Sequence, residues 1–243
     1  MIKNQSLIKV TLASLMLATL TGCPFDDDDD DAPVVVMPDP MPEPMEYSYD
    51  VTVTNLTYAQ PMSPIAGILH QDNKFWEIGT AASNALEVMA EGGDNSDLTG
   101  LAEALVSTST DGILAPGASA TFSLTTTDMT ASYLTVATML VNTNDAFSGL
   151  TGMDLSSLAV DQSHAMNLGV YDAGTELNSE AMGTIPGPAD SGTGYDSERN
   201  DIADVVTMHQ GIVSMDDGLS TSVLTQAHRF DNPALRITIT RTK

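Results

Sequence analysis

The chain has 243 residues, and 33 acidic side chains against 8 lysines and arginines give it a formal net charge of −25. So few basic residues exclude the phosphate-neutralising surface of a nucleic-acid-binding protein and disfavour a basic surface for anionic lipid. Hydrophobic residues make up 42% of the chain, which excludes a wholly disordered acidic protein. The length suggests one domain or two small ones. The single cysteine excludes an intrachain disulfide and an all-cysteine zinc site.

Residues 1–22 have the pattern of an export signal. Lys3 and Lys9 give a positive start, and the apolar stretch that follows is too short to span a bilayer comfortably. The stretch ends at Leu20-Thr21-Gly22-Cys23, which resembles the lipobox of bacterial lipoproteins. We therefore predict that Cys23 carries lipid and anchors the protein by acyl chains alone. An ordinary signal peptide or an anchor helix is the alternative.

The residue after the cysteine bears on the location in the envelope. An aspartate there often marks retention in the inner membrane of Gram-negative bacteria, and this chain has Pro24 instead. We therefore expect the outer membrane or the cell surface.

Residues 23–46 form an acidic, proline-rich segment. Positions 24–46 hold six prolines and nine acidic residues, including the aspartate run 26–31. Such a segment repels itself and has little to bury, so it predicts an extended tether between Cys23 and a folded domain over 47–243. Loose cation binding or a surface-sorting signal is the alternative function for the aspartate run. The spaced methionines lack the His or Cys neighbours that would favour a copper site.

Alternation of apolar and polar residues predicts most of the strands. A long apolar run at 133–141 predicts a central strand buried on both faces. The other predicted strands are 47–54, 122–124, 168–171, 205–208 and 235–240.

Helical spacing of apolar residues is confined to the first half of the domain. One helix is predicted from Ala82 through Met89 to Gly92-Gly93, and a second short one from Leu98 to Leu105. With strands at both termini and a turn signal about every ten residues, this pattern favours a mainly all-β fold. We expect an antiparallel β-sandwich with one or two short helices.

Enzyme motifs are absent from the sequence. Neither a Gly-x-Ser-x-Gly elbow nor a Gly-x-x-x-x-Gly-Lys phosphate loop occurs. The histidines show no local metal-binding spacing, so we expect them to be buried and hydrogen-bonded or on the surface; they are His70, His164, His209 and His228. A Ser/His/Asp set assembled from distant loops stays open, but nothing favours one, and we predict that the protein is not an enzyme.

Carboxylates follow two of the predicted strands. Asp145 comes after the strand at 133–141, and Asp172 and Glu176 lie on either side of Gly174 after the strand at 168–171. If these strands are neighbours, the three carboxylates meet at one end of the sandwich. They would then raise one another's pKa, and a divalent cation such as calcium, which prefers hard oxygen ligands, would remove the conflict. The alternative is that each aspartate caps its own turn.

Four stretches of the sequence resemble the spondin domain, the N-terminal module of the matrix proteins F-spondin and mindin. They are Ser63-Pro64-Ile65 with His70; Phe75-Trp76-Glu77-Ile78-Gly79 with Ala82-Ser83 and Ala90-Glu91-Gly92-Gly93; Asn144-Asp145; and Asp172-Ala173-Gly174-Thr175-Glu176. The last is similar to the family's Asp-Ala-Gly-Thr-Asp motif and is the most specific. The chain departs from the family at Asn144, Ala146, Tyr171 and Glu176, which replace Pro, Trp, Trp and Asp.

This resemblance implies an antiparallel β-sandwich with calcium at one end, and the family's ligand aspartates fall on Asp145, Asp172 and Glu176. We therefore expect a membrane-anchored, calcium-binding adhesion module of the bacterial cell envelope. We expect its further partner to be an extracellular protein or a glycan. We expect it not to bind nucleic acid. An envelope hydrolase with an unrecognised active site and a purely structural envelope lipoprotein are the alternatives.

Overall fold

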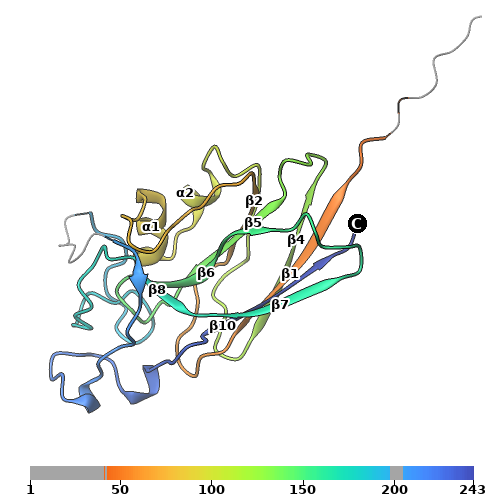
Figure 1. Cartoon of the computed structure of the whole chain (residues 1–243). Helices are drawn as coiled ribbons and strands as arrows, with labels where there is room; N and C mark the ends of the chain where they lie inside the picture. Colours follow the sequence, from red (N-terminus) through yellow and green to blue (C-terminus); the bar gives the residue numbers. More distant parts are fainter. Residues whose placement is uncertain (1–40, 42, 198–204) are drawn as a thin grey trace, which may run out of the picture. The chain divides into compact units, whose positions relative to one another are not determined.

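The computed structural model describes residues 41, 43–197 and 205–243, and its residues Glu43–Lys243 form one compact unit (Figure 1). The predicted signal peptide, Cys23 and most of the tether lie outside the described residues. Within the described part, no helix has both the length and the apolar character needed to cross a bilayer.

The strands form two antiparallel sheets, which confirms the predicted β-sandwich architecture. The four-stranded sheet has the order β4-β1-β10-β7, with β1 Tyr47–Asn55, β4 Ser119–Thr126, β7 Ser163–Leu168 and β10 Leu235–Arg241. The six-stranded sheet has the order β3-β2-β5-β6-β8-β9, with β2 Ala66–His70, β3 Val106–Ser109, β5 Tyr133–Met139, β6 Ala146–Asp154, β8 Val170–Asp172 and β9 Thr207–Met208. Two 3-10 helices, η1 Met215–Asp217 and η2 Gln226–His228, follow β9.

The main core fills the space between the sheets. Val51 and Val53 of β1 and Ile237 of β10 face it from the four-stranded sheet, and Leu134 and Val136 of β5 face it from the other. The outward-facing positions of β1 and β10 are polar, so these strands show the period-2 pattern from which they were predicted.

A second core covers the outer face of the six-stranded sheet. Leu86 and Met89 of the helix α1 (Asn84–Gly92) pack there with Phe147 of β6. Ser83 Oγ accepts a hydrogen bond from the Leu86 N–H at 3.3 Å, and Gly93 ends the helix at φ +73°. Because both faces are covered, β2 and most of β5 are buried throughout.

Both predicted helices are shorter than expected. Ala82 precedes the N-cap Ser83, so it lies outside α1. The helix α2 spans only Ser96–Thr99 and stops at Gly100, so the segment from Leu101 to Leu105 is not helical. Apolar spacing alone did not reveal this stop, because Leu101 still packs partly against the second core from its turn.

The predicted strand at 168–171 is in fact the junction of two strands. β7 ends at Leu168 in one sheet and β8 begins at Val170 in the other, so the chain changes sheets at Gly169. A Cβ on Gly169 would lie 2.9 Å from the methyl carbon of the flexible Met208 side chain and 3.2 Å from Asn232 Oδ1. The strand predicted at 205–208 is the shorter β9, and the strand predicted at 133–141 ends at Met139. Three strands were not predicted at all: β2, β3 and β6.

Candidate functional site

Asp145 and Asp172 are brought together by the pairing of β6 with β8. Asp145 directly precedes β6, and Ala146, the first residue of β6, is the register partner of Asp172 in β8. The Ala173 N–H donates to the Asp145 carbonyl at 3.3 Å. The condition under which the sequence brought these carboxylates together, that the strand at 133–141 neighbours the strand at 168–171, is not fulfilled, because β6 lies between β5 and β8. The two aspartates nevertheless meet.

The Asp145 carboxylate is buried and only partly satisfied. Its Oδ2 accepts hydrogen bonds from the backbone N–H groups of Thr175 at 2.9 Å and Glu176 at 3.1 Å. Its Oδ1 is buried and has no hydrogen-bond partner among the described residues. Burial, helped by the nearby negative charge of Asp172, raises the pKa of the Asp145 carboxyl to about 7. The site therefore carries a carboxylate whose charge is poorly compensated.

Asp172 lies beside Asp145 and holds its own turn. Its Oδ1 accepts from the Gly174 N–H at 2.8 Å, and its Oδ2 accepts from Asn178 Nδ2 at 2.5 Å. Gly174 has φ +74°, which permits the tight reversal after β8. The turn-capping alternative therefore applies to Asp172, although each capped oxygen keeps a second lone pair.

Glu176 reaches the site through its backbone. Its N–H donates to Asp145, whereas its carboxylate Oε2 accepts from Asn144 Nδ2 at 3.2 Å. Asn144 in turn donates to Thr184 Oγ1 at 2.9 Å. The Glu176 side chain is thus oriented by Asn144 and is buried, at 2% exposure.

The residues present match calcium in the chemistry of their donors. Calcium is bound by carboxylates, carbonyls and water, and a buried carboxylate oxygen without a donor, Asp145 Oδ1, suits that ligand set. The three predicted carboxylates are not gathered around one point, however. Across residues 43–197 and 205–243, no group of three or more His, Cys, Asp or Glu side chains is arranged to hold a metal ion.

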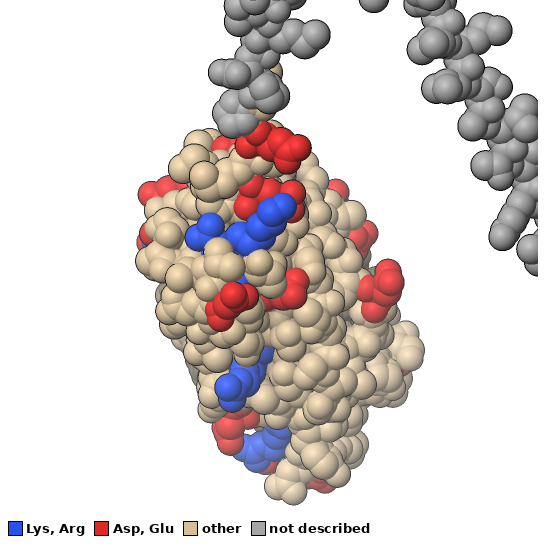
Figure 2. All heavy atoms as spheres, turned by 90° about the vertical axis from the view of Figure 1, so that its right-hand side faces the viewer, with Lys and Arg blue, Asp and Glu red and all other residues tan. Residues whose placement is uncertain are grey.

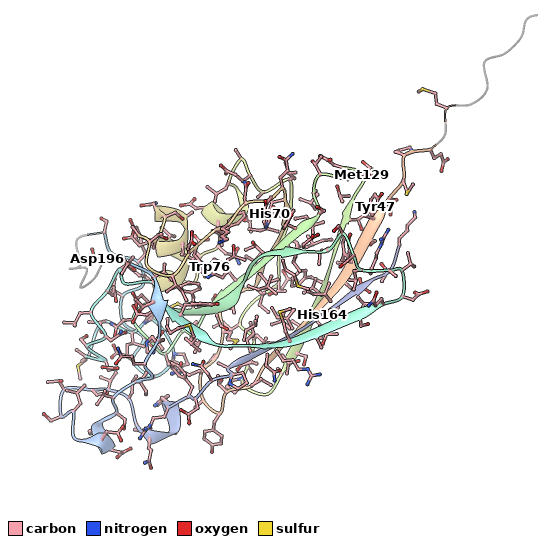
Figure 3. The ribbon with its side chains drawn as sticks, viewed as in Figure 1. Tyr47, His70, Trp76, Met129, His164 and Asp196 are labelled. Atoms are coloured by element: carbon pink, nitrogen blue, oxygen red, sulfur yellow. The ribbon has the colours of Figure 1, made fainter. Side chains whose placement is uncertain are left out.

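The histidines occupy separate places in the fold, and Figure 3 labels two of them, His70 and His164. His70 is buried, with Nε2 at 2.8 Å from Thr135 Oγ1, and His164 is exposed on β7. His209 is buried against the Phe230 ring, and His228 Nδ1 accepts from the Thr225 N–H at 3.0 Å. Both kinds of placement that the sequence predicted for histidine therefore occur.

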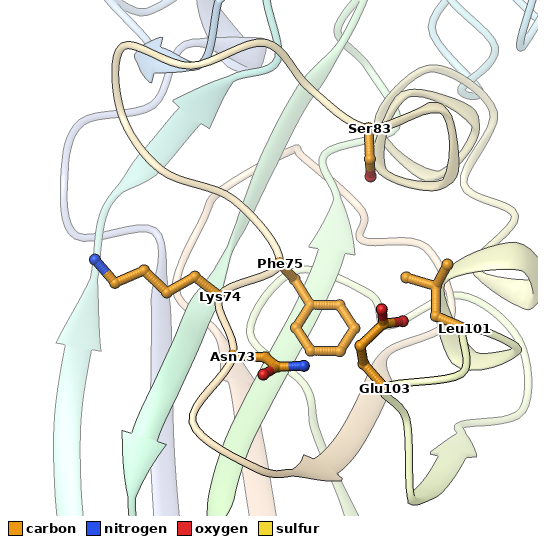
Figure 4. Close-up of a pocket in the computed structure, with 6 residues that line it drawn as sticks. All are labelled: Asn73, Lys74, Phe75, Ser83, Leu101 and Glu103. Atoms are coloured by element: carbon orange, nitrogen blue, oxygen red, sulfur yellow. The ribbon is translucent and has the colours of Figure 1, made fainter.

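Two cavities were not predicted from the sequence. One, of about 410 Å³, lies beside the Phe75 ring between Asn73 and Glu103, and Figure 4 shows Lys74 pointing away from these side chains. Its lining offers one carboxylate and no histidine, so it lacks the paired groups of acid–base catalysis. The other, of about 470 Å³, is lined by Asp172 and Glu180.

On one face of the molecule, positive and negative side chains lie close together. Figure 2 shows one face, on which the Lys and Arg side chains lie next to Asp and Glu side chains and form no continuous basic patch. Two of the ion pairs are Lys243 with Glu46 at 3.2 Å and Arg229 with Asp217 at 2.8 Å.

Comparison with known proteins places most of this architecture in one family. A search of curated proteins finds no match to the chain. The Spondin_N family model matches residues 53–184, which is more than half of the chain and includes Asp145, Asp172 and Glu176. The protein therefore belongs to the Spondin_N family.

Proposed function

We propose that this protein is a calcium-binding recognition or adhesion module, held in the bacterial cell envelope by lipid on Cys23. Membership of Spondin_N, a family of non-enzymatic binding modules, supports the binding role. The lipobox-like sequence and the acidic segment 23–46 support an anchored domain on a tether. The outer membrane or cell surface is the location that Pro24 favours.

The observation that carries the calcium proposal is Asp145 Oδ1. A buried carboxylate oxygen without a donor costs free energy, and here the neighbouring Asp172 adds like-charge repulsion. A bound calcium ion would supply the missing positive charge. Asp145 and Asp172 would hold the ion first, with Glu176, backbone carbonyls or water completing its shell.

The only tryptophan of the sequence gives this proposal a direct readout. The Trp76 ring lies 5.8 Å from the ring of Tyr171, the residue before Asp172, and 5.2 Å from that of Phe147. Trp76 is 6% exposed, so its fluorescence senses packing rather than solvent contact. We expect calcium to change the Trp76 emission of the full chain in mild detergent, saturably and reversibly with chelator, and to raise its melting temperature.

A matched pair of variants tests the role of the carboxylate. Asp172 and Asp128 each accept the backbone N–H two residues ahead at 2.8 Å, so an asparagine at either position disturbs the same kind of turn. At a hundredfold excess over Kd, calcium should stabilise the wild type by about 2.7 kcal/mol. Asp128→Asn should keep this gain and Asp172→Asn should lose most of it. Equal calcium responses in both variants would remove the metal from the proposal.

The partner is addressed by a separate screen. The sandwich end that contains Asp145 and Asp172 is the proposed recognition surface for an extracellular protein or glycan. We expect immobilised glycans or matrix proteins to retain the wild type more strongly with calcium than with chelator. If retention is the same with calcium, with chelator and in Asp172→Asn, recognition uses another surface of the domain.

A further inference from the structure

A cavity lies next to the proposed calcium site. The cavity of about 470 Å³ lies between β8, β9 and the segment after β9, and we call it the β8–β9 cavity. Asp172 and Glu180 line it from the part of the chain that matches the family model. Met208, Val213 and Arg229 line it from beyond residue 184, where that match ends.

Glu180 is an unusual residue in this wall. It is 3% exposed, and its Oε1 accepts from the Val213 N–H at 3.1 Å. Its Oε2 is buried and has no hydrogen-bond partner among the residues that the structure describes. Either protonation state leaves this atom unsatisfied, since a carboxylate would lack a donor and a carboxylic acid would lack an acceptor. Burial also raises the pKa of the Glu180 carboxyl.

The backbone of Glu180 is held in a conformation that residues other than glycine rarely adopt. Its φ is +46°, its N–H donates to Asn144 Oδ1 at 3.3 Å and its carbonyl accepts from the Val223 N–H at 2.8 Å. Strain of this kind persists where the surroundings over-determine it, and it concentrates at ligand sites. The fold thus holds an ionisable side chain in a costly position in the wall of a cavity.

The charges of the lining define the ligand. Three carboxylates, those of Asp172, Glu180 and Asp217, line the cavity with one guanidinium, that of Arg229. Arg229 Nη1 donates to Asp217 Oδ1 at 2.8 Å, so that positive charge is already paired. Of the other two carboxylates, Asp172 belongs to the proposed calcium site, so Glu180 is the lining carboxylate without a cationic partner. The cavity is far larger than a bare ion needs. Its walls also include aliphatic side chains at Met208, Ile212 and Val213.

We propose that the β8–β9 cavity binds an alkylammonium group, with the Glu180 carboxylate as its anion and the aliphatic side chains around its carbon chain. An ammonium supplies the positive charge that the lining lacks, and it would donate to Glu180 Oε2 once a small movement of this side chain exposes that buried atom to the cavity. Such a group is carried by free amines and by the lysine side chains of a protein partner. This site goes beyond the proposed calcium function and uses Glu180, which is not among the proposed calcium ligands.

The test uses the full chain in mild detergent and butylammonium chloride as the probe. We expect saturable binding in calorimetry and a shift of the Met208 methyl NMR signal, assigned by its loss in Met208→Leu. 1-Butanol, which has the same carbon chain without the charge, should not bind detectably. Glu180→Gln should weaken binding about tenfold or more, whereas Glu77→Gln, which alters an exposed carboxylate elsewhere, should leave it unchanged.

The calcium proposal and the alkylammonium proposal can be overturned independently of each other. Binding of butylammonium should persist in chelator and in Asp145→Asn, so loss of the calcium response alone leaves it intact. A comparison of Nα-acetyl-lysine-N-methylamide with cadaverine tells which source fits better, a peptide lysine or a free diamine.

No saturable binding, equal binding of 1-butanol, or unchanged affinity in Glu180→Gln would overturn the proposal. If Glu180→Gln does not fold, Gln210→Lys, which places a tethered ammonium in the cavity lining, must block the probe.

Discussion

The Asp145 carboxylate accepts the backbone N–H of Glu176 at 3.1 Å, so the two residues meet through one side chain and one main chain rather than through two carboxylates. The same Oδ2 also accepts the Thr175 N–H. Asp145 therefore holds the turn after β8 in place from the start of β6. The shape of this turn therefore depends on whether the buried Asp145 carboxyl is charged.

That coupling predicts a pH dependence of stability. The pKa of Asp145 is raised to about 7 in the folded state, whereas it is near 4 in the unfolded state. Between about pH 4 and about pH 7 the folded state therefore keeps a proton on this carboxyl that the unfolded state has released. In chelator, raising the pH across this window should destabilise the wild type, by roughly 1.4 kcal/mol for each pH unit that separates the two pKa values. Thermal unfolding at a series of pH values measures this, and Asp145→Asn should lack this component.

Glu180, whose pKa burial also raises, contributes to the slope in both proteins, so the difference between the two curves isolates Asp145. Calcium should flatten the wild-type curve, because the ion favours the charged carboxylate. Identical pH curves for wild type and Asp145→Asn would mean that folding does not shift the pKa of this carboxyl.

The turn after β8 should tolerate no side chain at Gly174. A Cβ there would lie 2.4 Å from the Val205 carbonyl oxygen, at φ +74°. Gly117 has nearly the same φ, +75°, with nothing within 4 Å of its Cβ position. Gly117→Ala should thus cost about 1 kcal/mol from strain alone, and Gly174→Ala at least about 2 kcal/mol more from the clash. Denaturant unfolding of both variants measures the difference, and equal losses would contradict the close approach of Val205.

Cys23→Ser tests the anchor. Without its thiol the chain cannot accept lipid, so the variant should move from the membrane fraction to the soluble fraction or remain unprocessed. Cell fractionation with immunoblotting measures both outcomes. A variant that is processed normally and stays with the membranes would rule out lipidation at this position.

The tether should be dispensable for folding. Its described contacts with the domain are exposed, namely Lys243 with Glu46 at 3.2 Å and the Tyr47 hydroxyl with the Met45 sulfur at 3.5 Å. An exposed ion pair contributes about 0–1 kcal/mol. A fragment that starts at Tyr47 should therefore melt cooperatively within a few degrees, roughly 2–4 °C, of the full chain. A much larger loss would show that residues before Tyr47 pack on the domain.

The sequence predicted three of the strands that have one wet face, but it missed β3 and all of β7 except Leu168. β1, β4 and β10 alternate because water covers one side of their sheet, and each was recognised from that alternation. β2 is buried along its whole length and β6 along its first half, so neither shows a period of two, and Gly149 and Gly152 interrupt β6 further. Burial on both faces removed the alternation from β2 and from the first half of β6, whereas β5, which is also buried on both faces, was predicted from its long apolar run.

The site was predicted in part, for a related reason. The position of carboxylates after predicted strands and the resemblance to spondin domains both singled out Asp145 and Asp172. The argument from position lacked β6, which lies between β5 and β8. Glu180 and the cavity that it lines could not be predicted. The partners of Glu180 come from Asn144, Val213 and Val223, which no local pattern in the sequence connects with it.

The place of β1 in its sheet has a mechanical consequence for the anchored adhesion module that we propose. The tether enters the domain at Tyr47, at the opposite end from β8 (Figure 1). β1 is paired with β4 over 47–54 and with β10 over 49–55, so both of its edges are bonded. A pull on Tyr47 against a ligand held near β8 runs along β1 and loads these hydrogen bonds side by side, in shear. The bonds must then fail together rather than unzip in turn, which suits a domain that holds a load against its tether.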